Sequence, residues 1–250
     1  MRVPRLRLRE RRIFYRSRVV RELASIARWR RRRREGPDLA HLVFHPELLA
    51  GPVQRDEALL LHALVRVVRP QTVLELGFYH GASAFNFLRA LDDDARLYSF
   101  DIDPACEALA RERFAHDPRF VFRLCSQAEL TADDIDGRRA DLVLLDAAHD
   151  VTLYQAALER LLPLMAPDAI LAIHDTGTVP RELFPPGHWL LDNRERWVGD
   201  EYEHQPDERE FVNWIRDTYP EFAQLHLHSR RTIRCGLTLL QRSAPLPRPG

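Results

Sequence analysis

The chain has 250 residues, 45% of them hydrophobic, and its 37 basic and 37 acidic residues give a formal net charge of zero. This size suits one α/β domain with a substantial core, and we expect neither a membrane span nor a secretory signal, because no apolar run is long enough for either. The cysteines Cys106, Cys125 and Cys235 are too scattered for a disulfide framework or a C-x-x-C pair, which favours a reducing, cytoplasmic location.

Residues 1–35 form an Arg-rich N-terminal extension. They contain 15 Arg and 3 Glu, a net charge of +12, whereas the remaining 22 Arg and 34 acidic residues give −12. One interpretation is a solvated, partly disordered tail. The other is a basic amphipathic helix that contacts nucleic acid, an anionic lipid surface or the acidic body of the chain itself. The pattern alone leaves both open.

Residues 36–242 are expected to form one domain in which strands and helices alternate. Strand-like runs lie at 72–76, 95–101, 119–124, 140–146 and 169–175, with helices at about 57–68, 82–91, 104–115 and 153–164. A helix at about 208–219 precedes two last strands, QLHLH and CGLTLLQ. Continuously hydrophobic strands separated by single helices predict a doubly wound, Rossmann-like fold: a seven-stranded, mostly parallel sheet with helices on both faces.

Two segments interrupt this alternation. Residues 176–206 contain several Pro, Trp and Tyr residues, and we expect a lid or substrate loop there. Residues 243–250 form a Pro-rich tail.

The first strand-to-helix turn, ELGFYHGAS, has the features of a ligand site. Gly77 and Gly81 permit a sharp bend and a close approach to a ligand, and a helix N-terminus favours a carboxylate or phosphate. The turn lacks the G-x-G-x-x-G and G-K-[ST] spacings, which disfavours NAD and ATP. Asp101 ends the second strand, where a carboxylate can hold ribose hydroxyls, while Asp103 before Pro104 is expected to cap the next helix.

Over about residues 53–240, these motifs together resemble the class I S-adenosylmethionine-dependent methyltransferases. The similarity is greatest to the small-molecule O-methyltransferases, which include the catechol, caffeoyl-CoA and bacterial sugar O-methyltransferase-like enzymes. It implies S-adenosylmethionine as cofactor, with the acid of VLELGFYHGASA near the methionine amine, Asp101 on the ribose, and CSQAE near the adenine. The cofactor-binding residues implied are Glu75, Gly77, Tyr79, Gly81, Ser83, Asp101, Ser126, Gln127 and Asp146.

The same resemblance gives a role to the acids that end the fourth and fifth strands. Asp146 and Asp175 match carboxylates that bind a divalent cation in the metal-dependent branch, and Thr176, which stands where that branch has an Asn ligand, is the third candidate ligand. Such a hard-oxygen site suits Mg²⁺, Mn²⁺ or Ca²⁺. His149 stands in place of the catalytic Lys of catechol-type enzymes and is the candidate general base. His174 should point away from Asp175 and is interpreted as structural.

The function predicted is transfer of a methyl group from S-adenosylmethionine to a hydroxyl of a small molecule, assisted by a divalent cation such as Mg²⁺. The acceptor would be the sugar or phenolic part of a metabolite or glycan. Two alternatives stay open: an RNA methyltransferase that uses the Arg-rich extension, and a non-catalytic scaffold with the same fold. An acidic body and the lack of an N-P-P-Y-like motif count against the first. A homo-oligomer is also open.

Overall fold

The computed structural model describes residue 53 and residues 55–180, 196–198, 201–203, 205–227 and 236–243. The Arg-rich extension and the Pro-rich tail beyond Ser243 therefore lie outside the described residues, and the predictions made for them remain predictions. Among the described residues, no helix combines the length and the apolar character needed to cross a membrane.

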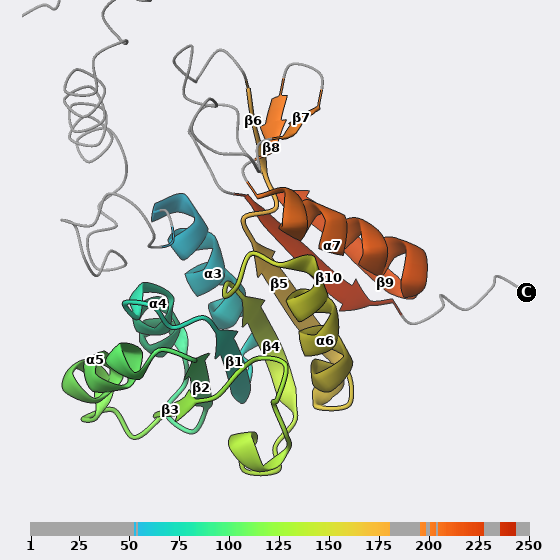
Figure 1. The fold of residues 1–250 in the computed structure, drawn as a ribbon. Coiled ribbons are helices and arrows are strands. Elements are labelled where there is room, and N and C mark those ends of the chain that lie inside the picture. Colours follow the sequence, from blue (N-terminus) through green and yellow to red (C-terminus); the bar gives the residue numbers. More distant parts are fainter. Residues whose placement is uncertain are drawn as a thin grey trace, which may run out of the picture.

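The described part contains a main sheet of seven strands in the order β3-β2-β1-β4-β5-β10-β9 (Figure 1). Neighbouring strands from β3 to β5 are parallel, whereas β10 runs antiparallel to both β5 and β9. This confirms the predicted seven-stranded, mostly parallel sheet. The strands are β1 (Thr72–Leu76), β2 (Arg96–Asp101), β3 (Phe120–Leu124), β4 (Ala140–Leu145), β5 (Met165–His174), β9 (Phe222–Leu227) and β10 (Leu237–Arg242).

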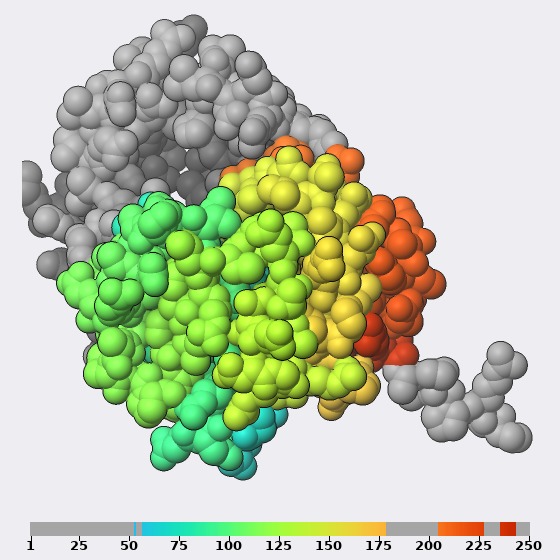
Figure 2. Space-filling view, turned by 60° about the horizontal axis from the view of Figure 1, so that its bottom comes forward, coloured from blue at the N-terminus to red at the C-terminus, as the bar shows by residue number. Residues whose placement is uncertain are grey.

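Helices cover both faces of this sheet, and each face has its own core. Leu61, Phe87 and Phe114 belong to the core under α3, α4 and α5, and Leu158 and Phe211 belong to the core under α6 and α7. Figure 2 shows the green residues, which include α5, at the left of the molecule and the orange residues, which include α7, at the right. The helices are α3 (Arg55–Val68), α4 (Ala82–Ala90), α5 (Pro104–Phe114), α6 (Val151–Leu161) and α7 (Pro206–Thr218), with a short 3₁₀ turn, η2 (Asp133–Ile135).

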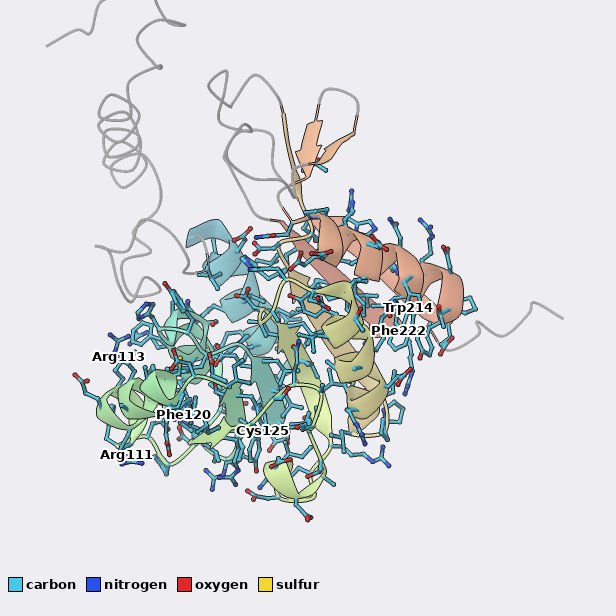
Figure 3. The ribbon with its side chains drawn as sticks, viewed as in Figure 1. Arg111, Arg113, Phe120, Cys125, Trp214 and Phe222 are labelled. Carbon is cyan, nitrogen blue, oxygen red and sulfur yellow. The ribbon has the colours of Figure 1, made fainter. Side chains whose placement is uncertain are left out.

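Aromatic side chains pack near both edges of the sheet, and Figure 3 labels Phe120, Trp214 and Phe222 among them. Phe120 on β3 packs against Phe114, with ring centroids 4.9 Å apart. On the opposite edge, Phe222 on β9 makes an edge contact with Tyr219, which in turn contacts Trp214 of α7. These contacts bury the aromatic rings near each edge, while β3 and β9 stay partly exposed.

The segment predicted as a lid differs in part from that expectation. Its described portions form a second, three-stranded antiparallel sheet of β6 (Thr178–Pro180), β8 (Glu201–Glu203) and β7 (Arg196–Val198). Thr, Val, Trp and Tyr favour extended strands, and the register places Trp197 opposite Tyr202. A lid role for residues 176–206 remains a prediction.

The turn after β1 brings the ends of three strands together. The backbone N–H groups of Gly77 and Phe78 donate to the carbonyl of Phe100 at 2.9 and 3.1 Å. The backbone N–H of Asp146 donates to the carbonyl of Leu76 at 2.8 Å. Gly77 has φ +104°, and a Cβ there would lie 1.9 Å from the carbonyl oxygen of Asp146. Only glycine therefore allows this turn to pass the end of β4.

We expect Gly77→Ala to lower the free energy of unfolding by at least about 3 kcal/mol, because both the backbone conformation and the space at this position exclude a methyl group. Gly137→Ala is the matched control, since Gly137 also has positive φ, +69°, but open space around it. It should cost only about 1–2 kcal/mol. Urea unfolding of both variants measures the difference, and equal losses would show that the contact with Asp146 does not matter.

Candidate active site

A cavity of about 560 Å³ lies at the carboxyl ends of β1, β2 and β4. Most of the site residues predicted from sequence line it: Gly77, Tyr79, Ser83, Asp101, Ser126, Gln127, Asp146, His149 and Asp175. Residues that come from distant parts of the sequence thus share one cavity, as expected where parallel strands end.

Three predicted residues, Glu75, Gly81 and Thr176, are not among the residues that line this cavity. A Cβ on Gly81 would lie 2.7 Å from the rings of Phe78 and Phe114, so this glycine serves packing behind the turn. The hydroxyl of Thr176 is buried and accepts a hydrogen bond from Thr238 on β10 at 2.7 Å.

Glu75 is a completely buried carboxyl group just behind the cavity wall. The hydroxyl of Ser99 donates to its Oε2, while Oε1 has no hydrogen-bond partner among the described residues. Burial raises the pKa of Glu75 to about 8, against the opposing effect of the Ser83 and Ser99 hydroxyls. Ser83, whose hydroxyl interacts with this acid, lines the cavity. A cation bound there would favour the ionised form of the acid.

Asp101 fixes the turn after β1, which lines the cavity. Its Oδ2 accepts hydrogen bonds from the backbone N–H groups of Phe78 and Tyr79 at 3.1 and 2.9 Å, and its Oδ1 accepts one from Asp103 at 3.0 Å. A carboxylate has about four acceptor positions, so a ribose hydroxyl would share this group with the turn. The prediction that Asp103 caps a helix is confirmed, because its side chain accepts from the N–H of Ala105 at 2.8 Å.

Gln127, on the loop after β3, has a buried side-chain amide. Neither its amide nitrogen nor its amide oxygen has a hydrogen-bond partner among the described residues, and it lines the cavity. Buried polar groups in proteins are nearly always paired, so this amide marks a place where a polar ligand can bind. Neighbouring Ser126 accepts a hydrogen bond from the N–H of Ala128 at 3.3 Å.

Asp146, His174 and Asp175 form a tight cluster in the wall of the cavity. Nδ1 of His174 lies 3.1 Å from an oxygen of Asp146 and 3.1 Å from an oxygen of Asp175. The expectation that His174 points away from Asp175 was therefore wrong. Side-chain alternation applies only within a strand, and β5 ends at His174, while Asp175 has φ +59°.

Glu57 of α3 lies on the other side of the His174 ring. Its Oε2 is 3.1 Å from Nε2 of His174, and its Oε1 accepts a hydrogen bond from the N–H of Gly236 at 3.1 Å. Burial lowers the pKa of His174, but the carboxylates of Asp146 and Asp175 outweigh it and raise that pKa well above its usual value. Burial likewise opposes ionisation of Asp146, yet the facing imidazole keeps the pKa of that acid below its usual value.

His149, the predicted base, lies in the loop between β4 and α6 and lines the same cavity. Its Nδ1 contacts Oε1 of Glu208, a buried acid at the start of α7 that also accepts a hydrogen bond from the Tyr154 hydroxyl at 3.0 Å. The hydrogen bond to Glu208 raises the pKa of His149. Nδ1 is also 3.9 Å from Asp175, which links His149 to the acid cluster.

Sequence reasoning missed Glu57 and Glu208, although a signal for each was present. Glu208 precedes Phe211, Val212 and Ile215 at the three-, four- and seven-residue spacing of a buried helix face. Glu57 is also on an apolar helix face, because it lies four residues before Leu61 near the start of α3. An acid on an apolar stripe is almost never fully buried unless it has a partner, so both positions indicate a buried polar contact.

The sheet order and the cavity at its carboxyl edge define the class of protein. Residues 74–176 match the sequence model of a family described as "Methyltransferase domain". Residues 74–176 thus match a methyltransferase domain, and the sheet order agrees with the resemblance to the class I methyltransferases.

Individual relatives agree with this assignment. Over 145 residues the chain is 31% identical to "Tapetum-specific methyltransferase 1" of Arabidopsis thaliana, an alignment that covers 53% of this chain and 60% of that one. The chain spans 60% or less of the length of the curated relatives it matches.

Two solved structures share the fold. A putative caffeoyl-CoA O-methyltransferase from Staphylococcus aureus has a TM-score of 0.60 at 15% identity, with 88% of this chain and 100% of that chain covered. The O-methyltransferase TomG from Streptomyces achromogenes, in complex with SAM, has a TM-score of 0.55 at 19% identity, with 88% and 90% covered.

We expect Glu75→Gln to remove a pH-dependent part of the stability. The pKa of Glu75 is about 8 in the folded protein against an ordinary value of 4.5, so the folded state keeps a proton that the unfolded chain releases. Wild-type stability should fall relative to that of the variant between about pH 5 and about pH 8, by at most about 1.4 kcal/mol per pH unit.

Urea unfolding at several pH values measures this difference. Glu112→Gln, which changes an exposed acid on α5, is the control and should show no such trend. A difference between Glu75→Gln and wild type that stays constant with pH would contradict the prediction.

Proposed function

We propose that the chain transfers a methyl group from S-adenosylmethionine to a hydroxyl group of a small molecule. The observation that supports this most is one cavity that is lined both by the turn after β1 and Gln127 and by Asp146, His149 and Asp175. Such a cavity provides a place for a nucleoside-containing methyl donor next to a base and an acid cluster. The O-methyl transfer named for TomG and the Staphylococcus aureus protein supports a hydroxyl acceptor.

The cofactor end of the cavity offers each kind of group that S-adenosylmethionine requires. The unmatched amide of Gln127 provides a donor and an acceptor for the adenine edge, and Asp101 provides a carboxylate for the ribose. Behind Ser83, the buried Glu75 supplies negative charge for the methionine ammonium. In this arrangement the positive end of the ligand compensates the acid whose ionisation burial disfavours.

At the acceptor end, His149 takes up the proton of the reacting hydroxyl. S-adenosylmethionine, when bound, supplies an already activated methyl group, so the remaining task is to align and deprotonate the acceptor oxygen. His149 lines the cavity and contacts the acid cluster through Asp175, which places an imidazole beside the groups that would orient the acceptor.

A divalent cation fits the donor set at this end. One donor atom each from Asp146, His174 and Asp175 lies within 4.8 Å of the others. Glu57 holds the far nitrogen of His174, as carboxylates commonly do behind a metal-bound imidazole. Thr176 was predicted as a third ligand, but its hydroxyl contacts Thr238, so we assign the third position to His174. A bound cation would orient the acceptor oxygen and lower its pKa, and the imidazole favours Mn²⁺, Fe²⁺ or Zn²⁺ over Mg²⁺.

Gln127→Leu should weaken S-adenosylmethionine binding while stabilising the free protein. The substitution removes a buried amide that is unpaired without a ligand, so folding improves, whereas the contact to the cofactor is lost. We expect a rise of about 1 kcal/mol in stability and a loss of roughly tenfold or more in affinity, measured by urea unfolding and calorimetric titration.

Gln224→Leu is the matched control, because the Gln224 amide donates to the carbonyl of Val212 far from the cavity. It should lower stability and leave the affinity unchanged. If wild type binds neither S-adenosylmethionine nor S-adenosylhomocysteine, the proposed function is wrong.

Asp175→Asn should reduce the affinity for Mn²⁺ by about tenfold or more, because it removes one of the charged ligands. Electron paramagnetic resonance of free Mn²⁺ measures the binding, and competition with Mg²⁺ gives the preference between the two ions. Asp168→Asn changes an exposed acid on the same strand, β5, and should bind like wild type. Equal affinity in all three proteins would remove the cation from the proposal and leave the methyl transfer intact.

A further inference from the structure

Glu208 is the most deeply buried acid near the candidate base and has no part in the function proposed so far. Its side chain is completely buried at the N-terminal end of α7, and it is the described residue that contacts both His149 and Tyr154. It does not line the cavity, so a ligand would not touch it directly. A buried carboxyl group is costly unless it has a specific partner, which raises the question of what Glu208 does.

The packing of two helices holds Glu208 in place. α6 and α7 lie side by side on one face of the sheet (Figure 1), and Tyr154 of α6 stacks on Phe211 of α7 with ring centroids 5.2 Å apart. The Tyr154 hydroxyl donates to Oε1 of Glu208, the same oxygen that contacts His149. The position of this oxygen is therefore set by the helix pair and not by the flexible end of a free side chain.

The contact between Glu208 and His149 also distinguishes the two nitrogens of the imidazole ring. Nδ1 faces Glu208, and the nearest oxygen of Asp175 is 3.9 Å from that same atom. A neutral imidazole carries one proton, and an acceptor at Nδ1 holds the proton there. Nε2 is then the nitrogen with a free lone pair.

We propose that Glu208 is a positioning residue that fixes His149 in the Nδ1-protonated tautomer, so that Nε2 is the atom that accepts the proton of the acceptor hydroxyl. This inference rests on the proposed function. As the acceptor oxygen bonds to the methyl carbon, the carbon–sulfur bond breaks and its electron pair stays with sulfur. The hydroxyl proton goes to Nε2. The positive charge thus passes from the sulfonium to the imidazolium, which the Glu208 carboxylate stabilises.

The test replaces Glu208 by its neutral isostere. In wild type at a pH above the His149 pKa, where the ring is neutral, nitrogen-15 NMR of histidine-labelled protein should show a single tautomer protonated at Nδ1. The His149 signals are assigned through a His149→Asn variant. In Glu208→Gln the signals should move to values averaged between the two tautomers, because an amide both donates and accepts. With catechol as probe acceptor, kcat should fall by about tenfold or more while KM changes little.

Two further variants separate positioning from folding. Glu210→Gln is the same change at an exposed position of α7 and should keep both the wild-type tautomer and the wild-type kcat. Glu208→Asp keeps the carboxylate and should restore the Nδ1-protonated tautomer in part. An unchanged tautomer in Glu208→Gln, or a loss of kcat no greater than in Glu210→Gln, overturns the inference.

The tautomer measurement needs neither cofactor nor acceptor. Failure of the proposed function would appear in the S-adenosylmethionine titration, and failure of this inference would appear in the NMR spectra. The two can therefore be told apart.

Discussion

The close approach of the turn after β1 to the end of β4 is the constraint on which the site depends. Gly77 leaves no room for a Cβ against the carbonyl of Asp146, and the hydrogen bonds of Gly77, Phe78 and Asp146 lock the ends of β2, β1 and β4 to one another. Because of this contact, the loop that would hold the cofactor and the loop that carries His149 share one wall. A ligand bound against the first loop is automatically near the second, and no domain movement is needed to bring them together.

Three buried glutamates lie near the cavity, and each is paired with a side chain that lines it. Glu75, Glu57 and Glu208 are each almost fully removed from water, and each sits behind a residue that lines the cavity: Ser83, His174 and His149. The acids therefore act on the cavity through an intermediate side chain. Removing a carboxylate from water is costly. A hydrogen-bonded imidazole offsets that cost for Glu57 and in part for Glu208, whose pKa burial still raises. Glu75 has only hydroxyl partners, and accordingly its pKa is the one raised to about 8.

The fold could be predicted from sequence because hydrophobic runs and their alternation depend on local patterns, and the strands after Thr72 follow them closely. The cavity residues Asp101, Asp146 and His149 could be predicted as well, because Asp101 ends β2, Asp146 directly follows β4 and His149 lies in the short loop after it. The orientation of His174 could not, since it depends on where β5 stops and on the left-handed backbone of Asp175. Glu57 and Glu208 required the tertiary contacts of α3 and α7, which no local pattern specifies, although their places on apolar helix faces were visible in the sequence.

The acids that contact the two histidines come from helices outside the segment that matches the family model. The family model covers residues 74–176, whereas Glu57 belongs to α3 before it and Glu208 to α7 after it. The strand ends thus supply the reacting side chains, and the neighbouring segments supply the groups that set their protonation and orientation. Two chains that match the family model equally well could therefore differ in the protonation of these histidines. The difference would come from helices outside the matched segment. The protonation and orientation of the histidines can therefore change between relatives even when the segment that matches the family model does not.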